Sequence, residues 1–211
     1  MYLTCTLTFR KLYHTLKGIP ASQIRSESTR TKPRFPLLPP PPPPLSSAQR
    51  RTISSPFSAS AEKAGGYLLW TDASSIGHGG YCLPMSKEDM SKVKRGTLHS
   101  PHEAVITGGP SLEYSRPWAW SERLHDINYL EMAAILYGLS LWKPQFREKE
   151  VIAFCDNAPA VNRLQGLNKP GNTVALLREI TQLCAQFDIK LSSQWIPRQA
   201  NRKADSLSRP R

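Results

Sequence analysis

Four acidic residues occupy positions that the requirements of folding alone do not explain, so a chemical role is considered for each of them. Asp72 and Asp156 each come directly after an apolar run. Glu131 is the one charged side chain in a long apolar segment, and no Lys or Arg stands three or four residues away from it. Burying an unpaired carboxylate costs several kcal/mol. Asp205 lies in a polar segment near the last residues of the chain.

Carboxylates that converge repel one another unless a divalent cation holds them. Mg²⁺ prefers oxygen ligands and keeps several of its waters. Two such ions about 3.5–4 Å apart activate a water and stabilise the leaving oxygen of a phosphodiester, so that no carboxylate has to act as the nucleophile. For Glu131 there is a plainer alternative, an acid near a helix N-terminus that the helix dipole stabilises.

The elements around these acids predict that the carboxylates meet. Residues 67–73 and 150–155 are apolar runs typical of buried strands, and residues 126–142 form an apolar helix that should be buried. Strands that alternate with helices favour a parallel sheet with crossover helices. In such sheets sites form at the carboxyl ends of the strands, where both strand-end aspartates would lie.

The remaining elements follow from similar patterns. Asp126 or Asn128 caps the apolar helix, and Pro144 closes it. Glycines at 77, 79 and 80 mark a tight return after the first strand. The other predicted elements are a second, antiparallel strand at 80–83, a third strand at 117–121, helices at 158–167 and 173–187, a last strand at 189–197 and a terminal helix at 201–209.

A long polar insertion at 84–114 interrupts the predicted domain, which spans 65–211. A short helix near 87–95 is expected within it, and long loops of this kind are functional or disordered. His99 and His102 lie three apart in the insertion without a Cys or a third His beside them. We therefore expect these two histidines to be solvated.

Residues 1–64 differ in composition from the rest of the chain. They contain a run of six prolines and carry ten Lys or Arg against two acids, a net +8 of the total +12. Such a composition predicts a disordered leader. Because it is basic, rich in Ser and poor in acids, an organelle transit peptide, and thus a mitochondrial location, is the alternative. The remaining residues carry only +4, which alone is weak support for a polyanionic partner.

The four cysteines, Cys5, Cys82, Cys155 and Cys184, are far apart and form no C-x-x-C motif. Neither a zinc site nor a dithiol redox site is indicated. Cys155 and Cys184 lie in apolar segments, so we expect buried thiols in a reducing, intracellular compartment. No apolar stretch reaches the roughly 18–20 residues that span a bilayer, so no membrane association is expected.

The contexts of the four acids are W-T-D-A-S, I-N-Y-L-E-M-A-A, F-C-D-N-A-P-A-V and I-P-R-Q-A-N-R-K-A-D-S-L-S-R. In this order they resemble the type 1 ribonuclease H family. More narrowly, they are similar to the ribonuclease H domain of reverse transcriptases from DIRS-like and LTR retroelements. The resemblance covers about residues 66–209.

This resemblance implies an α/β fold with a five-stranded mixed sheet, order 3-2-1-4-5, and helices on both faces. It implies an endonuclease that hydrolyses the RNA strand of an RNA–DNA hybrid with two Mg²⁺ ions, or Mn²⁺ in their place. The four acids would be the catalytic metal ligands. The residues expected at the nucleic acid are Ser74, Asn128, Asn157, Asn201 and Arg202. For Asn157 and Asn201 a helix-capping role is at least as well supported.

The chain also departs from the family. Many cellular members carry a mobile histidine before the last acid, and residues 195–200 contain none. No Tyr-x-Asp-Asp polymerase motif occurs in residues 1–64, so a fragment, a decayed element copy and a domain put to another use are all open. A reverse transcriptase could then act in trans on a monomeric domain. The alternatives are a catalytically idle, nucleic-acid-binding relic of a retrotransposon polyprotein and, more remotely, an integrase- or resolvase-type nuclease.

Overall fold

The structure is a computed structural model that describes residues 64–94, 111–167 and 171–210. The leader predicted for 1–64 falls almost wholly outside these residues, and so does the middle of the 84–114 insertion. The insertion begins with the helix expected there, α3 (Lys87–Lys94), which buries Met90 and Val93.

A five-stranded sheet organises the described residues. Its strands are β1 (Gly66–Ala73), β2 (Gly77–Met85), β3 (Leu112–Pro117), β4 (Glu150–Cys155) and β5 (Lys190–Trp195). Their order is β3-β2-β1-β4-β5, the order predicted from the family resemblance. The β1–β2 and β2–β3 pairs are antiparallel, whereas β1–β4 and β4–β5 are parallel. All of β1 is buried, as its apolar composition requires.

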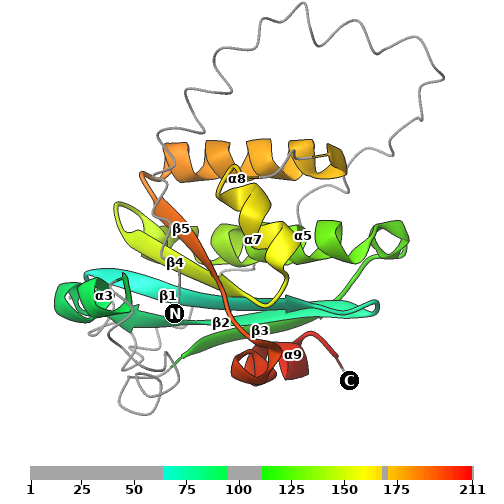
Figure 1. The fold of residues 1–211 in the computed structure, drawn as a ribbon, viewed down its shortest axis with the longest axis horizontal. Coiled ribbons are helices and arrows are strands. Elements are labelled where there is room, and N and C mark those ends of the chain that lie inside the picture. Colours follow the sequence, from blue (N-terminus) through cyan, green and yellow to red (C-terminus); the bar gives the residue numbers. More distant parts are fainter. Residues whose placement is uncertain (1–63, 95–110, 168–170, 211) are drawn as a thin grey trace, which may run out of the picture.

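Helices cover both faces of this sheet (Figure 1). The helices are α3, α5 (Ile127–Leu141), α6 (Lys143–Phe146), α7 (Ala158–Leu164), α8 (Val174–Gln186) and α9 (Arg202–Leu207). Alternate residues of β1 point to opposite faces. Leu69 belongs to the larger core cluster with α5, α7 and α8, and Trp70 belongs to a second cluster with α3 and α9.

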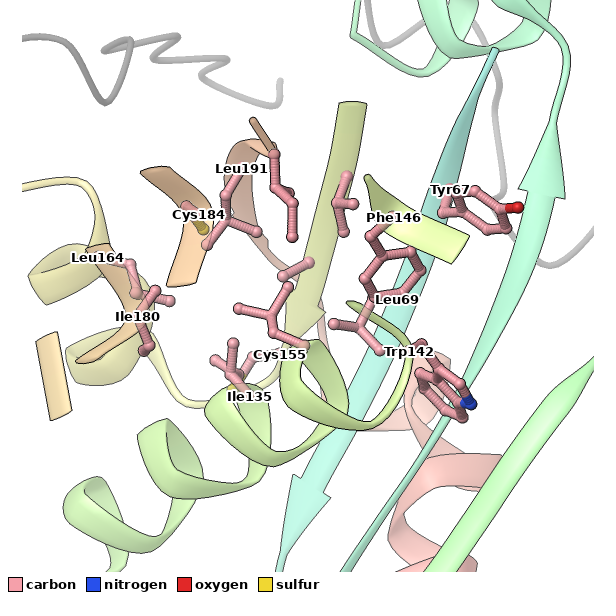
Figure 2. Packing of buried hydrophobic residues seen from close by; sticks show 14 of the residues in the cluster. Tyr67, Leu69, Ile135, Trp142, Phe146, Cys155, Leu164, Ile180, Cys184 and Leu191 are labelled. Atoms are coloured by element: carbon pink, nitrogen blue, oxygen red, sulfur yellow. The ribbon is translucent and has the colours of Figure 1, made fainter. Parts of the chain in front are cut away.

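The larger core cluster lies between the sheet and α5 and α8 (Figure 2). Leu69, Ile135, Cys155 and Ile180 are almost completely buried there. Cys184 is also buried, so the prediction of two buried thiols is confirmed. Cys155 is the last residue of β4, which brings the apolar core directly up to the strand end where an acid follows.

Helix α5 begins at the predicted cap. The Asp126 carboxylate accepts hydrogen bonds from the backbone N–H groups of Asn128 at 3.0 Å and Tyr129 at 3.2 Å. The helix ends at Leu141, three residues before Pro144, which lies in the first turn of α6. Because α5 is apolar on most sides, seven of its residues are buried, Glu131 among them.

The third strand lies at 112–117, and the prediction of a strand at 117–121 was wrong. The two tryptophans that suggested it do not lie on one buried face of a strand, because Trp118 is buried whereas Trp120 is 79% exposed. The edge strand β3 has one buried side chain, Tyr114, so its sequence carries little strand signal.

The glycines after β1 were also misplaced, because they lie within β2 and not in the turn, which is formed by residues 74–76. A Cβ on Gly79 would lie 2.2 Å from the backbone carbon of Leu207, and one on Gly77 would lie 2.5 Å from Pro210. These glycines therefore let α9 and the residues after it lie directly on β2. Among the described helices, none is long and apolar enough to cross a membrane.

Candidate metal centre

The carboxyl ends of β1 and β4 lie side by side, because the two strands are parallel neighbours in register from Gly66↔Glu150 to Trp70↔Phe154. Asp72 is the second-to-last residue of β1, and Asp156 follows the end of β4. The side chain of Glu131 reaches the same place from α5. Ligand atoms of Glu131, Cys155 and Asp156 all lie within 4.8 Å of one another.

Glu131 is 4% exposed. Burial raises the pKa of its carboxyl well above the ordinary value, and the nearby charges of Asp72 and Asp156 raise it further. A hydrogen bond from the Cys155 thiol, with Sγ 3.5 Å from Oε2, and one from the backbone of Ala73 only partly offset this effect. The groups that dominate its environment are therefore apolar or acidic, and they disfavour the charged form of Glu131.

Asp72 is also 4% exposed and stands outside the close group of three. Burial raises the pKa of its carboxyl to about 6, and the charges of Asp156 and Asp205 act in the same direction. A hydrogen bond with the Ser208 side chain and the charge of Arg209 lower the pKa of Asp72. The charge of Asp72 is thus coupled to those of Asp156, Asp205 and Glu131, whereas the close group of ligand atoms contains Glu131 and Asp156 but not Asp72 or Asp205.

The donor set fits a divalent cation. Three buried or half-buried carboxylates repel one another here, and a dication among them would replace that repulsion by attraction. Carboxylate oxygens are the ligands of hard cations such as Mg²⁺ and Mn²⁺. The Cys155 sulfur is a poor ligand for Mg²⁺, and its place in the apolar core makes it part of the packing beneath the site.

Asp205 approaches the same region from the opposite face of the sheet, on α9. Its carboxylate does not turn freely toward the other acids, because two arginines hold it. The Oδ1 atom accepts from Nη2 of Arg198 at 3.0 Å and from Nη2 of Arg209 at 2.9 Å. These hydrogen bonds, that of Arg209 first, lower the pKa of Asp205.

Two of the residues predicted to contact nucleic acid support the site instead. Asn201 is fully buried, and its Nδ2 donates to the backbone oxygen of Thr71 at 3.0 Å and to Oδ1 of Asp72 at 3.5 Å. Ser74 is 8% exposed, and its hydroxyl donates to the backbone oxygen of Ser208 at 2.7 Å. Both side chains are buried in this structure, and the nucleic-acid contact expected of them stays a prediction.

The other three predicted contacts remain accessible. Asn157 caps α7, its Oδ1 accepting from the N–H of Ala160 at 2.8 Å. Its Nδ2 donates to Oδ1 of Asn128 at 3.1 Å, so a pair of half-buried amides joins the starts of α5 and α7 beside Asp156. Arg202 is exposed at the first position of α9.

Sequence reasoning missed two tryptophans that fix the strand ends. The Trp195 indole donates to the backbone oxygen of Asp156 at 2.9 Å, and the Trp118 indole donates to that of Ser74 at 2.9 Å. Trp118 also stacks on the buried ring of His78, with centroids 4.0 Å apart. Each contact joins residues far apart along the chain, so no local pattern could have revealed it.

The family described as reverse transcriptase-like matches residues 120–210, a range that includes three of the four acids. None of the curated proteins matches the chain at a significant level. This match covers less than half of the chain and agrees with the reverse-transcriptase part of the resemblance, whereas the narrower DIRS-like resemblance is not confirmed.

Solved structures of similar fold include the N-terminal ribonuclease H domain of a Mycobacterium tuberculosis protein. It is 17% identical, with a TM-score of 0.47, over 67% of this chain and 95% of that one. Another is ribonuclease H1 LC11, solved with an RNA/DNA hybrid: 15% identical, TM-score 0.45, over 67% and 92% of the two chains. A third is a foamy viral protease–reverse transcriptase with an RNA/DNA hybrid, at 14% identity and a TM-score of 0.40. That match covers 83% of this chain and 23% of the viral one.

Proposed function

We propose that this chain, whose residues 120–210 match the reverse transcriptase-like family, is a metal-dependent ribonuclease H that hydrolyses the RNA strand of an RNA–DNA hybrid. The observation that carries the proposal is Glu131. It is a carboxylate buried in an apolar helix, and the charges closest to it are those of Asp72 and Asp156 at two strand ends. A fold without a cation-dependent task gains nothing from this arrangement, because each of these charges destabilises the others.

Asp72, Glu131 and Asp156 would hold Mg²⁺ or Mn²⁺, and Asp205 would complete the ligand set once its arginines release it. Such ions supply an activated water and stabilise the leaving oxygen of a phosphodiester. The protein's own contribution is the positioning of these ligands. Asn201 orients the Asp72 carboxylate through Oδ1, and the Trp195 indole fixes the backbone of Asp156.

The choice of an RNA–DNA hybrid as substrate rests on the family match and the motif resemblance. The amide pair Asn128–Asn157 lies beside Asp156 and offers hydrogen-bonding groups to a minor groove, where the 2′-hydroxyl distinguishes RNA from DNA. We further propose an origin in a reverse-transcribing element, with DIRS-like elements the narrower suggestion. A reverse transcriptase acting in trans on the same hybrid is the corresponding partner.

A cleavage assay with the full chain tests this function. An end-labelled RNA–DNA hybrid, duplex RNA and duplex DNA are incubated with Mg²⁺, Mn²⁺ or a chelator. We expect metal-dependent cleavage of the RNA strand of the hybrid alone. The isosteric variants Glu131→Gln and Asp156→Asn should abolish it, while Glu179→Gln on the exposed side of α8 should cleave like the wild type. Hybrid cleavage that survives Glu131→Gln would contradict the proposed site.

One observation favours a second candidate, a nucleic-acid-binding domain without catalysis. Asp205 is bound by two guanidinium groups and is therefore not free to serve as a ligand in this conformation. That candidate predicts metal-independent binding of the hybrid with no cleavage under any of the ionic conditions above. The same assay, combined with a binding measurement, thus separates the two functions.

A further inference from the structure

Two arginines bind the Asp205 carboxylate. Arg198 precedes α9 and Arg209 follows it, and both donate to the same oxygen, Oδ1. Arg198 and Arg202 also line an open hollow of about 230 Å³, together with Gln199 and Asp205. One carboxylate therefore faces an excess of positive charge beside the candidate metal centre.

The two ion pairs are easily exchanged. The side chains of Arg198 and Arg209 are 70% and 51% exposed, and that of Asp205 is 28% exposed. Exposed pairs of this kind contribute little to stability, since water competes for both partners. A guanidinium group also binds phosphate oxygens in the same forked geometry in which it binds a carboxylate. The Asp205 carboxylate thus occupies the place that a phosphate oxygen would suit.

We propose that Arg198 and Arg209 form a subsite for a backbone phosphate of the nucleic acid, which exchanges with Asp205. The exchange with Asp205 as a metal ligand rests on the proposed function, whereas the phosphate subsite itself does not. The arginines hold Asp205 while no other anion competes, and a backbone phosphate would exchange with that carboxylate even without a metal ion. A metal ion held by Asp205 would favour the same exchange. In a complex with nucleic acid that anion is a phosphate of the strand that lies over the hollow.

The chain offers a matched control in Arg147, which pairs with Glu148 at 3.5 Å. Their side chains are 65% and 69% exposed, and the pair lies directly after α6, away from the hollow. It is an exposed arginine–carboxylate pair with no other cation on the same oxygen. If the pairs of Arg198 and Arg209 with Asp205 are ordinary surface ion pairs, replacement of either arginine should affect hybrid binding no more than replacement of Arg147.

The first experiment measures binding of a fluorescent RNA–DNA hybrid to the full chain by anisotropy in chelator, over a series of salt concentrations. Each lost phosphate contact lowers the slope of log affinity against log salt by about 1. We expect that change for Arg198→Gln and for Arg209→Gln, and none for Arg147→Gln. Unchanged slopes for both variants, with unfolding midpoints equal to the wild type, overturn the subsite. Because no metal is present, this result does not depend on whether the chain cleaves.

The second experiment measures Mn²⁺ binding without nucleic acid, by quenching of the fluorescence of the tryptophans, among which Trp195 contacts Asp156. Removal of both competing arginines should tighten Mn²⁺ binding by up to about fivefold, the equivalent of one exposed ion pair. Weaker or equal binding overturns the exchange. Inorganic phosphate serves as a competitor in the first experiment: it should weaken hybrid binding to the wild type more than to the two variants, because only the wild type has the complete subsite. Equal competition on the wild type and the variants would overturn the subsite.

Discussion

Replacement of Asp72 by Asn should stabilise the metal-free protein near neutral pH. Asp72 is buried at the end of β1, and burial raises the pKa of its carboxyl from 3.8 to about 6. The ionised form is therefore worse accommodated in the folded chain than in the unfolded chain. Asn keeps the shape of the side chain and removes the charge.

The size and pH range of the effect follow from the two pKa values. Well below pH 3.8 the carboxyl is protonated in both states, and Asp72 has no electrostatic cost. As the pH rises toward 6, the unfolded chain ionises first, so the free energy of unfolding of the wild type falls. Each unit of pKa difference is worth 1.36 kcal/mol. The shift from 3.8 to about 6 therefore corresponds to about 3 kcal/mol, reached in full above pH 6.

Urea unfolding in chelator, followed by circular dichroism from about pH 4 to pH 7, measures this difference. The free-energy difference between Asp72→Asn and wild type should rise by up to about 3 kcal/mol across that range, whereas Glu179→Gln should show a flat difference. Saturating Mg²⁺ should then stabilise the wild type, by about 2.7 kcal/mol at a hundredfold excess over Kd, and leave Asp72→Asn unchanged. A variant that is no more stable than wild type at pH 7, with no pH-dependent difference, would refute the electrostatic reasoning.

Three further predictions concern the elements that hold the site. Gly79→Ala should lower the thermal unfolding midpoint strongly, because its Cβ would lie 2.2 Å from the backbone of α9, while Gly138→Ala, whose Cβ would meet a side chain at 3.3 Å, should be close to neutral. Asp205→Asn should change the free energy of unfolding by less than about 1 kcal/mol, since its ion pairs are exposed, yet should lower hybrid cleavage in the assay above. Trp118→Phe should cost about 1–3 kcal/mol in urea unfolding, because a buried carbonyl in the β1–β2 turn loses its donor.

The sequence sufficed to predict the elements whose residues are dictated by burial alone. β1 and β4 are apolar runs that end on an acid, and both form adjacent parallel strands. Glu131 could be singled out because a charge in an apolar helix is costly wherever the helix packs. For these features the local pattern and the tertiary structure impose the same requirement, so the pattern is informative.

The edge strand β3 shows why other elements escaped prediction. It pairs on one side only, and one of its side chains is buried, so no alternation of apolar residues marks it. Trp118 and Trp120, which follow β3 in the chain, show the alternation of apolar residues that β3 itself lacks. The burial of Trp118 comes from contacts with His78 and with the carbonyl of Ser74, about forty residues away in the chain.

The glycines of β2 suggested a turn from their sequence, but the structure requires them for a different reason. A cluster of glycines after a strand usually marks a turn, and here the turn precedes them. Gly79 pairs with Asp72 in the sheet and at the same time contacts Leu207 on α9. The need for a residue without a side chain is set by a helix that comes 128 positions later, which a local pattern cannot show.

The docking of α9 decides whether the fourth acid reaches the site. Helix α5, which carries Glu131, and helix α9, which carries Asp205, lie on opposite faces of the sheet (Figure 1). Three side-chain hydrogen bonds hold the α9 segment there: Ser115 to the backbone oxygen of Leu207 at 2.6 Å, Ser74 to that of Ser208 at 2.7 Å, and Asn201 to that of Thr71 at 3.0 Å. Because two of these bonds are buried, their loss is costly, whereas the arginine pairs of Asp205 are exposed and weak. The helix is therefore fixed, whereas the exposed ion pairs of its carboxylate can exchange for other partners, which is the combination that the proposed role of Asp205 as a metal ligand requires.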